Sequence, residues 1–388
     1  MQSEPKNSKS WFEQHPVITL FFVCSIFMLI VVCMAESILS YEKTIIDFST
    51  DRYIRLREHK PLLSGVFHDI DYDNVDQLKP KPKDYSFRTD ENGFIMPSKI
   101  HDKPDLAIVF LGGSTTECLR VDEENRFPYL AGRSIEKNIG LKTNSYNSGV
   151  FGNNSLHSLN ILLNKVILLK PDIVVMMHIF NDLSVLLHEG TYWNDNVYRS
   201  TIYKARPSDI LRKIKDSTIP HLYYKLNGIF NFNITSRVEN DEFQFNRKRK
   251  INIDKEHILG EFRMNLQTFI NICEARNITP VLMTQQNALT DDPDIVVTEG
   301  LKKLEGQGVD YKALKEIYDM LNQEIRDVGV KNRILVIDLD KAIPKSKDYI
   351  YDCGHFNNKG SIFAASVIEK SLRNIIALPK NSAVKIKK

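Results

Sequence analysis

Short strand-like runs, mostly apolar, alternate with stretches of helical spacing over the larger part of the chain. Continuous apolar strands that alternate with helices are typical of a parallel sheet covered on both faces. The pattern therefore predicts an α/β fold, flavodoxin-like and doubly wound, with a five-stranded parallel sheet. The strand-like runs are Leu106–Leu111, Ser145–Val150, Ile173–Met177, Pro280–Met283 and Ile334–Leu339, and two of the helical stretches are Asn154–Leu169 and His257–Ala275.

An uncharged apolar segment runs from Val17 to Ala35 near the N-terminus. Its length is close to the roughly 20 residues that a helix needs to cross a bilayer core, and it lacks the polar stripe of a buried surface helix. A cleaved signal peptide is the alternative, because Cys33-Met34-Ala35 resembles a small-residue cleavage site. The apolar region of a signal peptide spans only about 7–15 residues, so the length favours a retained transmembrane helix.

The charges that flank this segment leave its orientation open. Lys6 and Lys9 precede it, and Lys43 and Arg52 follow it within reach of the positive-inside effect. We expect a single-pass membrane protein whose large folded domain is extracytoplasmic.

The order of the segments predicts the domain organisation. A short tail (1–16) and the transmembrane helix (17–35) are followed by a stalk or linker with a lead-in (36–100), the α/β domain (101–378) and a basic C-terminal tail (379–388). Residues 189–255 fit the strand–helix rhythm badly and are rich in Tyr, Asn, Lys and Arg. A connection this long is typical of a functional cap or a disordered insert, and we favour the cap.

Composition narrows the functional classes. Apolar residues make up 42% of the chain and charged residues 26%, as in a globular protein with a full core. The net charge of +3 is spread along the chain, and the run Arg247–Lys250 lacks interleaved aromatic residues. We therefore expect no nucleic-acid partner.

Neither the cysteines nor the histidines form a tight metal-ligand pattern, and no CxxC spacing occurs. Without such spacing a structural zinc site is not expected, and we predict neither a metal nor a cofactor. The redox state of the cysteines stays open. Outside the apolar segment the cysteines lie far apart in the sequence, at Cys118, Cys273 and Cys353. A histidine cluster with a carboxylate would have to use His157, His178, His188 and Asp182.

Three polar motifs follow the first three predicted strands, at the sheet edge where α/β proteins bind ligands. Ser114 follows Gly112-Gly113, and the alternative to a nucleophile is a serine that caps a helix. Gly152 follows the second strand, where a glycine lets a backbone N–H approach a developing oxyanion. Asn181 follows the third strand and can offer its side-chain NH₂ to the same oxyanion, although an Asx turn is the alternative.

A fourth motif, Asp352-Cys353-Gly354-His355, precedes an apolar helix near the C-terminus. Histidine is the usual general base, and a carboxylate on its second nitrogen fixes the tautomer and the ring orientation. A separation of three residues in a loop lets both side chains face one crevice. Cys353 is an alternative thiol nucleophile, but its place two residues before the base makes that role unfavourable.

In this order, Gly-Gly-Ser114-Thr, Asn147-x-Gly-x-x-Gly152, Asn181-Asp182 and Asp352-x-x-His355 resemble the four blocks of the SGNH/GDSL hydrolase superfamily over about residues 105–370. The resemblance implies Ser114 as nucleophile, His355 as base and Asp352 as its orienting carboxylate. It also implies an oxyanion hole from the Ser114 N–H, Gly152 and Asn181. The segment Arg88–Phe94 is similar to the lead-in of bacterial surface-polysaccharide members.

Two positions depart from the family pattern. Gly113 stands where the family usually has an aspartate, and Ile179 stands where the third block usually has a glycine. The second change affects the strand end that carries Asn181.

The motifs predict a serine esterase that works through an acyl-enzyme. Its expected substrate is an ester, and the N-terminal helix together with the polysaccharide-type lead-in favours an O-acetylated glycan. An O-acetyltransferase that uses the same site is one alternative. A catalytically silent, membrane-tethered binding module is another, and it predicts a damaged set of catalytic residues.

Overall fold

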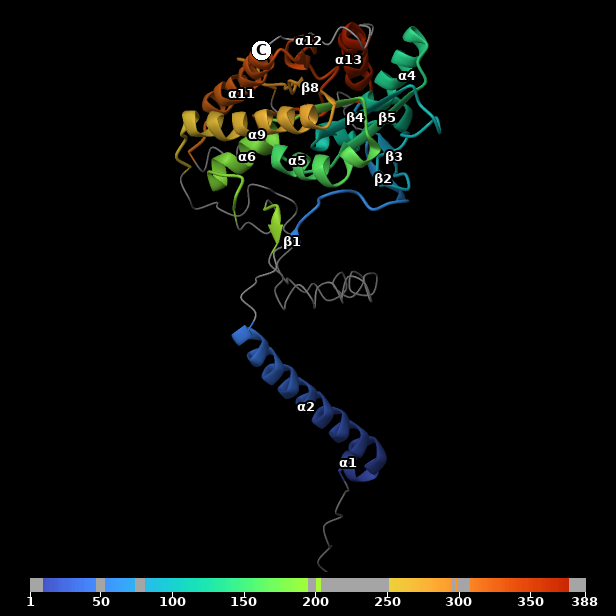
Figure 1. Cartoon of the computed structure of the whole chain (residues 1–388), viewed down its shortest axis with the longest axis vertical. Coiled ribbons are helices and arrows are strands. Elements are labelled where there is room, and N and C mark those ends of the chain that lie inside the picture. The colour runs from blue at the N-terminus through green and yellow to red at the C-terminus, as the bar shows by residue number, and fades with distance from the viewer. Residues whose placement is uncertain are drawn as a thin grey trace, which may run out of the picture. The chain divides into compact units, whose positions relative to one another are not determined.

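The computed structural model describes residues 10–46, 53–73, 81–194, 200–203, 251–294, 297–298 and 308–376. The chain forms two compact units, Met1–Tyr53 and Ile54–Lys388 (Figure 1). The first unit contains the short helix α1 (Trp11–Gln14), which Ser10 and Glu13 begin with a capping box, and the long helix α2 (Pro16–Ile46). The stretch Pro16–Ala35 of α2 has a mean hydropathy of 3.0, and none of its residues is buried within the protein. This helix is long and apolar enough to cross a membrane, and a signal sequence has the same properties.

The second unit is built on a five-stranded sheet in which every neighbouring pair is parallel. The strand order is β5-β4-β6-β8-β9, which is 2-1-3-4-5 in chain order within this sheet. This is the flavodoxin-like order, and it confirms the predicted α/β fold. The strands are β4 (Leu106–Gly112), β5 (Thr143–Gly149), β6 (Ile173–Met177), β8 (Thr279–Met283) and β9 (Leu335–Ile337).

Helices cover both faces of the sheet (Figure 1), and alternate residues of each central strand enter two separate cores. On β4, Val109 and Leu111 join the core formed with α5, α6, α9 and α11, whereas Ile108 and Phe110 join the core formed with α4 and α13. Burial on both faces explains why β4 and β6 are continuous apolar runs. The helices are α4 (Phe127–Ile139), α5 (Ser155–Asn164), α6 (Phe180–Glu189), α9 (Lys255–Ala275), α11 (Tyr311–Asn332) and α13 (Asn358–Ile376).

Several element boundaries differ from the sequence prediction, and two of these differences are of more than a residue or have a clear local cause. The stretch Asn154–Leu169 is not one helix, because α5 ends at Asn164 and the 3₁₀ helix η2 (Val166–Leu169) follows. Strand β9 ends at Ile337, because the Asp338 side chain accepts a hydrogen bond from the Lys341 N–H and begins the short helix α12 (Leu339–Ala342). Side-chain caps of this kind compete with the strand ladder.

The residues before β4 pack on the same unit. Strands β2 (Ser64–Ile70) and β3 (Pro82–Arg88) form an antiparallel hairpin, and the Ile95 N–H donates to the Asn147 carbonyl of β5 at 2.9 Å. The buried guanidinium of Arg126 donates to the carbonyls of Met96 and Ser86, each at 2.6 Å. These bonds satisfy a buried charge that would otherwise be costly.

The remaining short elements are the paired strands β1 (Tyr53–Ile54) and β7 (Ile202–Tyr203), the helix α3 (Ser114–Glu117) and the 3₁₀ helix η1 (Glu123–Asn125). Most of the predicted cap, residues 195–199 and 204–250, lies outside the described residues.

Candidate active site

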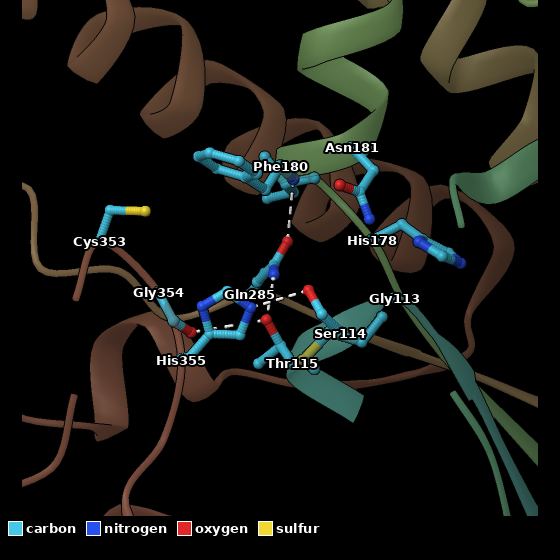
Figure 2. Close-up of a pocket in the computed structure, with 12 residues that line it drawn as sticks. Gly113, Ser114, Thr115, His178, Phe180, Asn181, Gln285, Cys353, Gly354 and His355 are labelled. Carbon is cyan, nitrogen blue, oxygen red and sulfur yellow. Dashed lines mark hydrogen bonds between the residues drawn. The ribbon is translucent and has the colours of Figure 1, made fainter. Parts of the chain in front are cut away.

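The loops that follow β4, β6 and β8 meet the loop before α13 at the carboxyl edge of the sheet (Figure 2). They enclose a small hollow next to Ser114, the first residue of α3. The hollow has a volume of about 20 Å³, which is room for little more than one water molecule. The side chains of Ser114, Asn181, Gln285 and His355 lie in its wall.

Ser114, His355 and Asp352 form a continuous hydrogen-bonded chain. The Oγ of Ser114 lies 2.7 Å from Nε2 of His355 (Figure 2), and Nδ1 of His355 lies 2.7 Å from Oδ2 of Asp352. The second oxygen of Asp352 accepts the backbone N–H groups of Gly354 and His355, both at 2.8 Å. The loop is therefore folded around its own carboxylate, which fixes the direction in which the imidazole points.

Charge and burial act in opposite directions on this pair. Burial raises the pKa of the Asp352 carboxyl, but the His355 imidazole and the backbone donors outweigh it and lower that pKa to about 2. Burial lowers the pKa of the His355 imidazole, but the Asp352 charge and hydrogen bond outweigh it and raise that pKa above its usual 6.5. The carboxylate is thus ionised at neutral pH and stabilises a proton on the imidazole.

Neighbouring groups hold His355 in place. The ring of Tyr351 stacks on the imidazole with centroids 5.7 Å apart and an angle of 15° between the planes. The carbonyl of Gly354 accepts a hydrogen bond from the side chain of Gln286 at 2.7 Å. An imidazole held in this way keeps one orientation, so it would need no further ordering during a reaction.

Asn181 stands in the first turn of α6, in the wall of the hollow. One N–H of its amide donates to the Asn153 carbonyl at 2.8 Å, and an amide carries two such donors. Gly152 does not line this hollow, although its neighbours contact the site. Asn153 binds Asn181, and Phe151 lines a second hollow that shares Ser114 and His355.

A buried polar network surrounds Asp182, the residue that follows Asn181 in α6. The Asp182 carboxylate accepts the N–H and the hydroxyl of Ser155 and the hydroxyl of Tyr192, the last at 2.6 Å. Burial raises the pKa of this carboxyl to about 6, although the hydrogen bonds act against it. Ser155 begins α5, so Asp182 joins the starts of α5 and α6.

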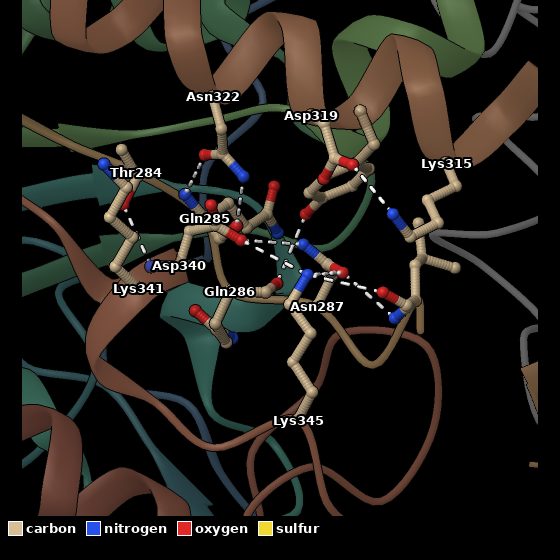
Figure 3. A network of polar contacts seen from close by, with 12 residues as sticks. Thr284, Gln285, Gln286, Asn287, Lys315, Asp319, Asn322, Asp340, Lys341 and Lys345 are labelled. Carbon is tan, nitrogen blue, oxygen red and sulfur yellow. Dashed lines mark hydrogen bonds and ion pairs between the residues drawn. The ribbon is translucent and has the colours of Figure 1, made fainter. Parts of the chain in front are cut away.

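Gln285 is a site residue that sequence reasoning did not identify. Its Oε1 accepts the Phe180 N–H at 3.0 Å, and its Nε2 donates to the Thr115 hydroxyl at 2.9 Å (Figure 2). Asn322 of α11 pairs with both backbone groups of Gln285 at 3.0 Å (Figure 3). The signal in the sequence is the polar run that directly follows the predicted strand Pro280–Met283.

The alternative reactive groups fit the site less well. Burial raises the pKa of the Cys353 thiol well above its usual value, so this thiol is not a ready nucleophile. His178 donates to or accepts from Ser158 at 2.7 Å, and burial lowers the pKa of its imidazole to about 3. Over the described ranges, no group of three or more His, Cys, Asp or Glu residues is arranged to hold a metal ion.

Neither a protein-family model nor a curated protein sequence matches the chain. A GDSL-like lipase from Bacteroides thetaiotaomicron is similar in structure, with 14% identity, a TM-score of 0.37 and coverage of 69% of this chain and 88% of that one. The lipase/acylhydrolase from Enterococcus faecalis shows 19% identity, a TM-score of 0.40 and coverage of 70% and 96%. An acetylxylan esterase from Geobacillus stearothermophilus shows 14% identity, a TM-score of 0.39 and coverage of 71% of this chain and 95% of that one. GDSL-like lipases and acetylxylan esterases are thus structural neighbours of this chain, and the function proposed below is based on the site geometry.

Proposed function

We propose that this protein is a serine esterase of the SGNH type. The observation that carries the proposal is the unbroken chain of two 2.7 Å hydrogen bonds from Ser114 through His355 to Asp352. A serine, an imidazole and a carboxylate in this order are the arrangement that activates a hydroxyl for acyl transfer.

In the proposed reaction, the Ser114 Oγ attacks the ester carbonyl carbon while the His355 Nε2 takes the hydroxyl proton. Asp352 stabilises the resulting imidazolium, as the raised pKa of the His355 imidazole supports. The imidazolium then protonates the departing alcohol and leaves an acyl group on Ser114. Water, deprotonated by the same imidazole, attacks the acyl-enzyme and releases the acid.

The negative oxygen of the tetrahedral intermediate needs donors that are already aligned. We assign this role to the N–H groups of Ser114 and Gly152 and to the second N–H of the Asn181 amide. Within the described residues, neither of these two N–H groups donates to a backbone carbonyl in a turn, loop or cap, which supports the assignment. Asn181 is already fixed by its bond to Asn153.

The proposed substrate is a short acyl ester, with acetyl as the acyl group. The hollow of about 20 Å³ next to Ser114 is of a size that suits an acetyl methyl, and a second hollow of about 50 Å³ also reaches Ser114 and His355. We further propose that the acetyl group is removed from a glycan and that α2 anchors the chain in a membrane, with the α/β unit on the extracytoplasmic side. The apolar stretch Pro16–Ala35 supports the anchor.

The test is turnover of an aryl acetate by the full chain in detergent, compared with Ser114→Ala. We expect hydrolysis by the wild type and a loss of about 10³-fold or more in the variant, because the nucleophile is removed. Equal hydrolysis by the two proteins would reject the serine-esterase proposal. A fluorophosphonate probe should label the wild type and not Ser114→Ala.

The test also separates the alternatives. A silent binding module would not turn over any ester, although the intact Ser114–His355–Asp352 chain does not resemble a damaged site. An O-acetyltransferase would form the acyl-enzyme and pass the acetyl group to a sugar hydroxyl, so acetylated sugar would exceed free acetate when an oligosaccharide acceptor is added. Aryl esters of increasing chain length test the acetyl preference directly.

A further inference from the structure

We infer that Arg57 is a positioning residue for the oxyanion hole, because its guanidinium holds the peptide group that presents the Gly152 N–H. This inference rests on the proposed function, in which that N–H is an oxyanion donor. Arg57 lies about 95 residues before Gly152 and outside every motif that the sequence offers.

Residues Val150–Asn153 form a tight turn directly after β5. The Asn153 N–H donates to the Val150 carbonyl at 3.0 Å, and Gly152 has a φ of +72° whereas Phe151 does not adopt a positive φ. A positive φ at the third position alone identifies a type II turn. Glycine is favoured there because it carries no Cβ.

The central peptide of this turn joins the Phe151 carbonyl to the Gly152 N–H. Between turn types I and II this peptide rotates by roughly half a turn, while the flanking chain keeps its course. The rotation would reverse the direction of the Gly152 N–H. The turn type therefore decides whether that N–H points to a substrate or away from it.

Arg57 holds this peptide and the next one. Its Nη2 donates to the Phe151 carbonyl at 2.9 Å, and its Nη1 donates to the Gly152 carbonyl at 3.0 Å. A planar guanidinium offers two parallel donors in a fixed fork, so it fixes two successive carbonyls together. A charged donor on the Phe151 carbonyl also polarises that peptide, which makes the opposite N–H a stronger donor.

The backbone of Arg57 binds the same loop. Its carbonyl accepts a hydrogen bond from the Asn153 side chain at 3.0 Å, and the Asn153 carbonyl accepts the Asn181 amide at 2.8 Å. Arg57 is thus linked to both proposed donors. It binds the carbonyl of the peptide that carries the Gly152 N–H, and it is linked to Asn181 by way of Asn153. The turn and Asn181 are therefore joined in one hydrogen-bonded network to which Arg57 contributes both its side chain and its carbonyl.

The experiment measures kcat and KM of full-length Arg57→Ala and Arg57→Lys in detergent with an aryl acetate. Loss of one aligned oxyanion donor costs about 10²–10³ in kcat. We expect Arg57→Ala to lose between about 10-fold and 10²-fold, because a freed peptide still samples the productive turn, with little change in KM. Arg57→Lys should lose less, since one ammonium can still hold one carbonyl.

The readout specific to an oxyanion role is the ratio of kcat/KM for an aryl acetate to that for the matching aryl thionoacetate. A sulfur in place of the carbonyl oxygen accepts hydrogen bonds weakly, so a correctly aligned oxyanion hole favours the oxygen ester. The ratio should fall in Arg57→Ala, whereas a loss of folded protein lowers both rates equally. If Arg57→Ala does not fold, as thermal unfolding would reveal, Arg57→Lys answers the same question.

Glu58→Gln is the matched control, because it removes the neighbouring ion pair between Glu58 and Lys165 (2.9 Å) and leaves Arg57 intact. Its kcat and its oxygen-to-sulfur ratio should equal those of the wild type. A wild-type kcat or an unchanged ratio in folded Arg57→Ala would overturn the inference while leaving the esterase proposal in place. If the wild type is inactive, or if Ser114→Ala is as active as the wild type, the esterase proposal itself fails and the role of Arg57 fails with it.

Discussion

A Cβ atom on Gly113 would lie 2.5 Å from Nδ2 of Asn181. Such a separation is too short for two non-bonded atoms, so the glycine that precedes Ser114 leaves space for the amide of α6. This contact gives a physical reason for Gly113 in a position where the resemblance predicts an aspartate. The absence of a side chain at residue 113 and the position of Asn181 depend on each other.

We therefore predict that Gly113→Ala reduces activity by displacing Asn181. The expected loss in kcat is about 10²-fold, comparable to removal of one oxyanion donor, with the thermal unfolding temperature little changed. The measurement is steady-state hydrolysis of an aryl acetate. Gly260→Ala on α9, where a Cβ meets no atom within 4 Å, is the control and should keep wild-type kcat. Full activity in Gly113→Ala would show that Asn181 is either unmoved or not needed.

Asn181→Ala removes the proposed side-chain donor itself. We expect kcat to fall by about 10²–10³-fold, with KM nearly unchanged because the interaction forms only in the transition state. Asn164→Ala, at the exposed end of α5, serves as the control. A large rise in KM at unchanged kcat would instead indicate that Asn181 binds the substrate in its ground state.

Asp352→Asn keeps the shape of the loop and removes the carboxylate charge. The asparagine no longer stabilises the imidazolium and can favour the wrong tautomer of His355, so we expect kcat to fall by about 10⁴-fold. Covalent labelling by the fluorophosphonate should slow in parallel, because the probe reacts with the same activated Ser114 hydroxyl. Activity within a few-fold of the wild type would mean that His355 is oriented by other groups.

The pH dependence of kcat/KM follows from the pKa of the His355 imidazole, which lies above 6.5. The neutral imidazole is the base, so activity should be absent well below that pKa and should rise as the pH increases through it. The acid limb is therefore expected above pH 6.5. Any residual activity of Asp352→Asn should show this limb at lower pH, because burial then lowers the His355 pKa without the opposing carboxylate. An identical limb in the two proteins would assign it to another group.

Cys353→Ala tests the alternative nucleophile. The thiol pKa is raised by burial, so we expect this variant to keep at least wild-type reactivity toward the fluorophosphonate and kcat within a few-fold. Thiol-selective alkylation of the wild type should leave esterase activity intact under the same reasoning. If alkylation inactivated both the wild type and Cys353→Ala, another cysteine would be responsible for the loss of activity.

The sequence alone determined the fold class and the order of the candidate residues. Continuous apolar runs at β4 and β6 reflect burial on both faces of a sheet, and this is a local property of the chain. The parallel sheet then brings the ends of those strands to one edge, so Ser114 and Asn181 are predictable from their positions directly after a strand. The pairing of Asp352 with His355 is predictable because the two residues stand three positions apart in one loop before a helix.

Only the tertiary structure decided which side chains meet. The hydrogen bond between Ser114 and His355 joins residues 241 positions apart, and its length depends on loop conformations that no local pattern specifies. The contacts of Gln285 with Thr115 and of Arg57 with the turn at Gly152 likewise join segments that are distant in the sequence. Apolar periodicity records burial but not the direction of an individual hydrogen bond. That direction is set by packing and by the need to pair buried polar groups, which exist only in the folded chain.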